Sequence, residues 1–164
     1  MSVKKIFVLI ISFIISSVVI PYTYTATGKT ELLITAVPTP TPLSGKPPYS
    51  EYKGVSIGLT IDEARAKLGV PKEKLEGQDF YEFSPNESAQ VYYDAAQKVS
   101  AFTVTYIGKL DNAPSPKAVF GEDAEVKPDG GIFKMVRYPK AGFWISYNKT
   151  GGDDPIIMIA MQKM

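Results

Sequence analysis

The pattern of hydrophobic and polar residues divides the chain into an apolar run, a proline-rich stretch and a region of short amphipathic segments. In the third region, Thr60-Ile-Asp-Glu63 matches a capping box, and Gly69 followed by Pro71 marks the end of a helical pattern. The sequence therefore predicts a short helix over Ile61 to Leu68.

Segments rich in β-branched and aromatic residues follow this helix, separated by turn-forming residues. They predict three strands: Asp79–Ser84, Ala89–Asp94 and Val99–Ile107. The pattern then recurs with a second short helix from Ser115 to Phe120 and three more strands: Ile132–Tyr138, Gly142–Asn148 and Pro155–Gln162. We therefore expect two helix-β-β-β repeats, at about 54–107 and 115–162. The expected fold class is α+β, a mainly antiparallel sheet with short helices packed on one face.

Residues 1–26 have the features of an export signal. Lys4 and Lys5 precede a run of fifteen mostly apolar residues, Ile6 to Ile20, and small and polar residues come after Pro21. Cleavage after Ala26 is one interpretation. The other is a retained N-terminal membrane anchor at residues 6–20, although a spanning helix needs about 20 residues. Both interpretations place the rest of the chain outside the cytoplasm, in the periplasm, the cell envelope or the extracellular space.

Residues 27–51 predict a tether. Five prolines lie between Thr35 and Ser50, and proline favours the polyproline II conformation over helix or central strand. The folded domain is therefore expected at 52–164.

Composition excludes several classes of function. The chain contains no histidine and no cysteine, which removes disulfides, a lipid-bearing cysteine, thiol nucleophiles, the usual zinc sites and the serine–histidine relay. Its net charge is +1, so a basic surface for nucleic acid is not expected. No cofactor, metal or catalytic residue is predicted.

Three stretches of the first repeat are similar to a known family. GVSIGLTIDEARAKLGVP, QDFYEF and VYYDAAQKVSAFTV resemble the BamE/SmpA-like repeat, which β-lactamase inhibitor protein uses in tandem. The resemblance implies a small envelope or secreted module that binds other proteins and performs no chemistry. It is close over residues 54–106 and loose over 115–161. The acylated cysteine of the outer-membrane lipoproteins and the disulfides of the secreted inhibitors are both missing, so the resemblance bears on the fold more than on any partner.

Aromatic residues on the predicted strands are the candidate binding residues. Because successive side chains of a strand point to opposite faces, one layer of helices cannot cover all of them. Tyr92 and Trp144, at equivalent repeat positions, are expected on an open face as partner-binding residues, together with Phe80 and Phe133. Packing in the core or in cross-strand pairs is the alternative.

Three functions remain open. The first is a non-enzymatic module that binds another envelope or secreted protein. A carbohydrate or peptidoglycan binder would instead use the same aromatic residues to stack on sugar rings. The third, a carboxylate-dependent enzyme using residues such as Glu82 and Asp94, requires two acids at a defined separation in a cleft.

Overall fold

The computed structural model describes residues 47–164. The predicted export signal and most of the predicted tether lie outside the described residues. The described chain forms two helices and seven strands: α1 (Ile61–Leu68), β1 (Glu73–Leu75), β2 (Gln78–Ser84), β3 (Glu87–Tyr93), β4 (Val99–Tyr106), α2 (Pro116–Phe120), β5 (Ile132–Tyr138), β6 (Phe143–Lys149) and β7 (Ile157–Lys163).

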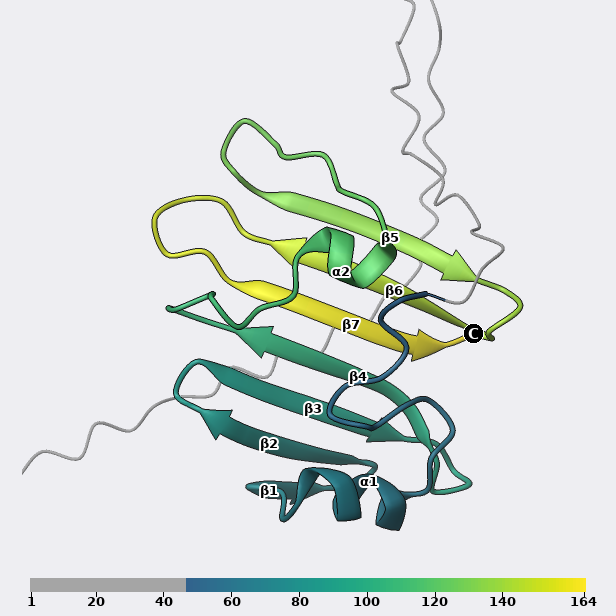
Figure 1. The fold of residues 1–164 in the computed structure, drawn as a ribbon. Coiled ribbons are helices and arrows are strands. Elements are labelled where there is room, and N and C mark those ends of the chain that lie inside the picture. Colours follow the sequence, from purple (N-terminus) through teal and green to yellow (C-terminus); the bar gives the residue numbers. More distant parts are fainter. Residues whose placement is uncertain (1–46) are drawn as a thin grey trace, which may run out of the picture. The chain divides into compact units, whose positions relative to one another are not determined.

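All seven strands belong to one antiparallel sheet with the order β1-β2-β3-β4-β7-β6-β5. Strands β2, β3 and β4 form one meander, and β5, β6 and β7 form another. The two meanders join where β4 pairs with β7, so the middle of the sheet is a pairing between residues far apart in the sequence (Figure 1).

Helix α1 follows directly from its capping box. The Glu63 amide donates to Thr60 Oγ1 at 3.3 Å, and the Thr60 amide donates to Glu63 Oε2 at 2.8 Å. These bonds satisfy backbone donors that have no partner inside the helix. Gly69, at φ 87°, takes a backbone conformation that other residues rarely adopt, and the helix ends there. The predicted helix at Ile61–Leu68 is confirmed.

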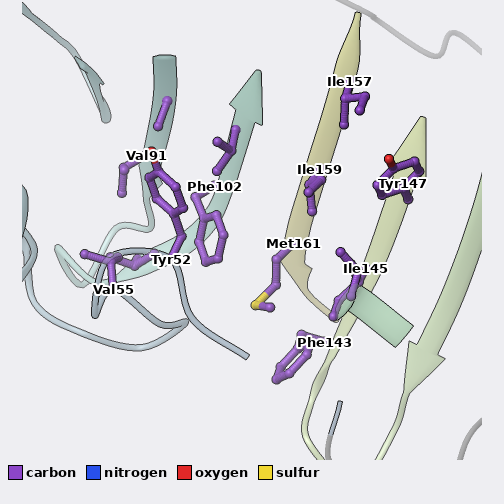
Figure 2. Close-up of a cluster of buried hydrophobic side chains, with 14 of the residues drawn as sticks. Tyr52, Val55, Val91, Phe102, Phe143, Ile145, Tyr147, Ile157, Ile159 and Met161 are labelled. Atoms are coloured by element: carbon purple, nitrogen blue, oxygen red, sulfur yellow. The ribbon is translucent and has the colours of Figure 1, made fainter. Parts of the chain in front are cut away.

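The hydrophobic core lies on one face of the sheet. Alternate residues of the central strands point into it, among them Val91, Phe102, Ile145, Ile159 and Met161, each at most 1% exposed. Figure 2 shows these side chains gathered from the strands of both meanders, so the two halves share one core.

The segment that leads into α1 covers part of this face. Figure 1 shows it crossing the sheet on the same side as α1 and α2. Tyr52 and Val55 of this segment are buried against the sheet near Phe102 (Figure 2). The Tyr52 hydroxyl also donates to Glu87 Oε1 at 2.6 Å, which fixes the segment to the start of β3.

The expected α+β class is wrong. The structure is mostly a seven-stranded antiparallel sheet, and its helices have only eight and five residues. Their contribution to the core is small: α1 buries only Ala64, and α2 buries Val119 and Phe120. The reason is local, because glycine ends each helix almost as soon as it has formed, at Gly69 and Gly121. The irregular segment before α1, with Tyr52 and Val55, covers much of the core face that the prediction assigned to helices.

The element predictions otherwise differ from the structure by one or two residues at the ends. The exception is β1, which the sequence analysis missed. Its three residues, Glu-Lys-Leu, are all exposed and show no alternation of polar and apolar character, which is the signal that marks a strand.

Candidate functional site

The face of the sheet opposite the core carries the candidate site, and we call it the open face. Its residues come from every strand at the positions between the buried ones: Glu73, Leu75, Gln78, Phe80, Glu82, Ser88, Gln90, Tyr92, Ala101, Thr103, Thr105, Phe133, Met135, Arg137, Trp144, Ser146, Asn148, Met158, Ala160 and Gln162. Most of them are half-buried by their neighbours or exposed to solvent.

A groove lies on the four central strands of the open face, between Tyr92 and Trp144. The register aligns Tyr92 with Ala101, Ala101 with Gln162, and Gln162 with Trp144. Two large aromatic residues therefore stand three strand spacings apart, about 14 Å, on either side of smaller ones. The hollow between them has a volume of about 380 Å³, and Ala101, Thr103 and Ala160 contribute to its lining.

The walls of the groove are held in different ways. The Tyr92 hydroxyl donates to Gln90 Oε1 at 2.8 Å, so this ring is tied to the next open-face residue of its own strand. A tyrosine hydroxyl is already neutral over the physiological range, and partial burial raises the pKa of Tyr92 further. Trp144 is half-buried, and its cross-strand neighbours are Gln162 and Arg137.

All four residues that the sequence analysis selected lie on the open face, but only two lie together. Tyr92 and Trp144 wall the groove. Phe80 is half-buried on β2, paired with Gln90, while Phe133 is 56% exposed on β5, paired with Asn148. Phe80 and Phe133 are not among the groove residues.

The small residues of the groove were missed by sequence reasoning. Alanine and threonine carry no chemistry that marks a site, so Ala101, Thr103 and Ala160 drew no attention. Their signal is the alternation of β4 and β7, in which each follows or precedes a buried apolar residue. What the sequence alone does not give is the pairing of β4 with β7, which brings these residues side by side.

The centre of the open face carries no charge. Four strands, β3, β4, β7 and β6, contribute three residues each, and none of these residues is Asp, Glu, Lys or Arg. Soluble proteins are designed with about 25–35% charged residues on their surfaces. The charged residues of the face, Glu73, Glu82 and Arg137, are confined to the outer strands.

The two edges of the sheet are poor binding sites by comparison. Strand β1 has only three residues, two of them charged. On the other edge strand, β5, Lys134 lies on the covered side, where its ammonium donates to Glu122 Oε1 at 2.7 Å. Short, charged edge strands and inward-pointing lysines are the devices by which proteins prevent strand addition.

The covered face holds one buried carboxylate, Asp79, which is 1% exposed. Arg65 of α1 donates to both of its oxygens, at 2.8 and 2.9 Å, and the Tyr93 hydroxyl donates at 2.8 Å. Burial alone would raise the pKa of Asp79, but the hydrogen bonds from Arg65 and Tyr93 outweigh it, so the pKa is lowered. This cluster fixes α1 to the sheet.

The carboxylates considered for catalysis are far apart. Glu82 pairs with Ser88, and Asp94 lies six positions beyond Ser88, which is about 20 Å at ~3.3 Å per residue. Glu82 forms an ion pair with Lys72, while Asp94 Oδ1 accepts from the amides of Ala96 and Lys98. Those backbone bonds, that of Lys98 first, lower the pKa of Asp94. Paired catalytic carboxylates lie roughly 5–10 Å apart, so these two do not form such a pair.

Two further observations apply to residues 47–164. They contain no group of three or more acidic side chains placed to hold a metal ion. No helix among them is long and apolar enough to span a membrane.

Comparisons of the chain with protein-family models, with curated proteins and with solved structures gave no match. The likeness to the BamE/SmpA-like repeat stays a resemblance of short motifs.

Proposed function

We propose that this chain is an exported, non-enzymatic module that binds protein through the open face of its sheet. One observation carries the proposal: the centre of that face is free of charge and contains a groove of about 380 Å³ between Tyr92 and Trp144. Export is supported by the pattern of Lys4, Lys5 and the apolar run in the N-terminal sequence.

The composition of the face favours a protein partner. Buried centres of protein interfaces are depleted in charged residues and enriched in Tyr, Trp, Phe, Met and Arg. The open face has this composition, with Met135 and Met158 beside its aromatic residues and Arg137 at its margin. Its Thr, Ser, Asn and Gln side chains offer hydrogen bonds without the desolvation cost of a charge. The partner surface is therefore expected to be uncharged and partly apolar.

The chemistry of the groove favours binding over catalysis. Its lining residues are Tyr92, Ser100, Ala101, Thr103, Trp144, Ala160, Met161 and Gln162. Among them only Tyr92 titrates, and its raised pKa keeps it protonated. A general acid or base needs a pKa near the working pH, and no lining residue offers one.

The test is site-specific photocrosslinking of the full chain in its host. A photoreactive residue at Ser146, on the open face, is compared with one at Val70, which is 90% exposed and outside the face. We expect one identified protein to be labelled from Ser146 and not from Val70, and to bind the purified chain directly. Tyr92→Ala together with Trp144→Ala should weaken that binding at least about 30-fold, the effect of losing a single central aromatic anchor of about 2 kcal/mol.

Equal labelling from both positions, or unchanged affinity of the folded double variant, contradicts the proposal. If Ser146 labels no protein while glycans bind in a manner that Trp144→Ala abolishes, the carbohydrate-binding alternative replaces it.

A further inference from the structure

The residues of the open face form three rows that run across the strands. The first row contains Gln78, Tyr92, Ala101, Gln162, Trp144 and Arg137. The middle row contains Phe80, Gln90, Thr103, Ala160, Ser146 and Met135. The third row contains Glu82, Ser88, Thr105, Met158, Asn148 and Phe133.

Side-chain size changes from the first row to the third on two of the strands. Strand β3 carries Tyr92 in the first row and Ser88 in the third. Strand β6 carries Trp144 in the first row and Asn148 in the third. At one end of the face, β3 and β6 thus each carry a large aromatic side chain that projects from the sheet. At the other end, the same two strands carry small side chains.

On β3 and β6 this relief is complementary to itself. A two-fold axis along the middle row would lay the first row of one molecule over the third row of another. Tyr92 of each copy would then lie above Ser88 of the other, and Trp144 above Asn148. Arg137 would face the exposed ring of Phe133, an arrangement that favours a cation–π contact. Isologous interfaces require this match of a surface with itself.

We propose that the partner of the open face is a second copy of this chain, packed face to face about that axis. This inference rests on the proposed function, because it names the protein that the open face binds. The result is a sandwich in which each copy supplies one sheet, with the two sheets about 10 Å apart and their inner side chains interleaved.

Charge and edges both support this arrangement. The four central strands bring no charged residue to the face, so two copies meet there without burying an unpaired charge. Strand β1 is short and charged, and Lys134 of β5 points to the covered side, so neither edge strand favours pairing with a strand of another copy. Association is thereby directed to the face, which gives a closed dimer in place of a fibre.

The area of the face suits a weak dimer. From β2 to β5 it is five strand spacings wide, about 24 Å, and its three rows extend about 20 Å along the strands. Two such faces cover roughly 1,000 Å² in projection, the lower limit for a specific interface. This area includes Glu82 of β2, which is paired with Lys72, and Arg137 of β5. Glu73 of β1 lies on the axis and would meet its own copy, so the contact is expected to end at β2. Packed sheets are rotated by about 30° relative to each other, and this rotation moves the β1 edges of the two copies apart.

The absence of cysteine from the chain allows a direct test by cysteine placement. Each variant of the full chain receives one cysteine and is treated in its host with a short bifunctional thiol reagent. Thr103→Cys lies on the axis near the centre, so each thiol faces its own counterpart. Ala101→Cys lies in the first row and faces the third row of the other copy. Val70→Cys is the exposed control outside the face.

A dimer holds facing thiols at millimolar effective concentration, so Thr103→Cys should give a crosslinked dimer in roughly tenfold or greater excess over Val70→Cys. Ala101→Cys alone should give little dimer, and Ala101→Cys combined with Thr105→Cys should restore it. Adding Tyr92→Ala and Trp144→Ala to Thr103→Cys should reduce the dimer to the control level.

Equal yields for Thr103→Cys and Val70→Cys overturn the dimer. Equal yields for Ala101→Cys and Thr103→Cys overturn the axis along the middle row. If no chain dimer forms while Ser146 still labels a different, directly binding protein, this inference fails and the proposed function stands.

Discussion

The two faces of the sheet are made by the same strands and differ in almost every physical respect. Buried residues of β4 and β7 alternate with open-face residues, for example Ile159 beside Met158. The covered face contains tightly packed Tyr, Val and Ile residues. The open face contains Thr, Ser and Gln between isolated aromatic residues. Alternation therefore assigns stability to one face and leaves the other available for binding.

Charged residues are expected on the exposed face of a sheet and not on its buried face, but this sheet shows the reverse. The buried side holds the ionised Asp79, and the centre of the exposed side holds no ionised side chain. A charge inside the core is tolerated because Arg65, Tyr93 and Tyr81 donate to it. A solvent-facing surface has no such constraint, so its lack of charge needs a reason other than folding. Binding provides one.

The largest expected difference between the faces is in stability. Ile159→Ala removes a side chain with no exposed surface from the middle of β7 and leaves a cavity, so the free energy of unfolding should fall by about 3 kcal/mol. Met158→Ala, one residue away on the open face, should cost less than about 1 kcal/mol. Urea unfolding at the lowest workable concentration measures both with little contribution from association. Equal losses would show that the open face is packed in the folded chain.

The second prediction concerns the charge on the covered face. Asp79→Asn keeps the shape but removes the charge that faces Arg65, and should cost about 2 kcal/mol at neutral pH. Because the pKa of Asp79 is lower in the folded chain than the ~3.9 of an unfolded aspartate, its stabilisation is complete above about pH 4. That stabilisation is lost as the pH falls through the folded pKa.

The measurement is the free energy of unfolding of wild type and variant between neutral and acid pH. The difference between the two curves should shrink as the pH falls. Glu63 and Asp94 also have lowered pKa values, so both proteins should keep some acid dependence, which the difference removes. A constant difference across this range would contradict the assignment of a lowered pKa to Asp79.

A smaller effect is expected where the covering segment meets the sheet. Tyr52→Phe removes the hydrogen bond to Glu87 and should cost about 1.5 kcal/mol, the lower range for a bond to a charged group. Burial and then the bond to Glu87 raise the pKa of Tyr52, and burial raises that of Tyr106 to about 12. Both raised values stabilise the fold fully below pH 10. The contribution of Tyr106 is lost as the pH rises from about 10 towards 12, and that of Tyr52 begins to be lost over the same range.

Unfolding measured between pH 8 and 12 tests this directly. The variant should lose less stability than wild type over the alkaline range, because it has one tyrosine fewer to ionise. Parallel curves would mean that Tyr52 does not titrate differently in the folded and unfolded chains.

Local signals account for what the sequence predicted. The capping box at Thr60 and the glycine at Gly69 act within a few residues, and α1 begins and ends where they indicate. Alternation within each strand likewise placed Tyr92 and Trp144 on one face. The fold class was wrong because it depended on what covers the core. The segment with Tyr52 and Val55, which pair across a tight turn, has no period of its own, and only its contacts with the sheet identify it as cover.

The groove was beyond prediction for a related reason. It exists because β4 pairs with β7, across more than fifty residues of sequence, with Ala101 opposite Gln162. A shift of this register by two residues would keep every side chain on its face but would change which residues lie between Tyr92 and Trp144. The faces are encoded locally, whereas the shape of the site depends on a long-range pairing.

The last prediction separates the two faces with a single charge. Thr103→Lys introduces an ammonium group into the floor of the groove, where its long stem can lie along the sheet and its head can reach water. The free energy of unfolding should change by less than about 1 kcal/mol, the span of strand preferences. Association should weaken more than about tenfold, because the same charge becomes buried without a partner when the face is covered. Val70→Lys, at a position 90% exposed and outside the face, adds the same charge and should change neither quantity. Stability follows from urea unfolding, and association from crosslinking at Ser146. If Thr103→Lys unfolds the chain, its open face belongs to the core after all; if it leaves association intact, the binding surface lies elsewhere.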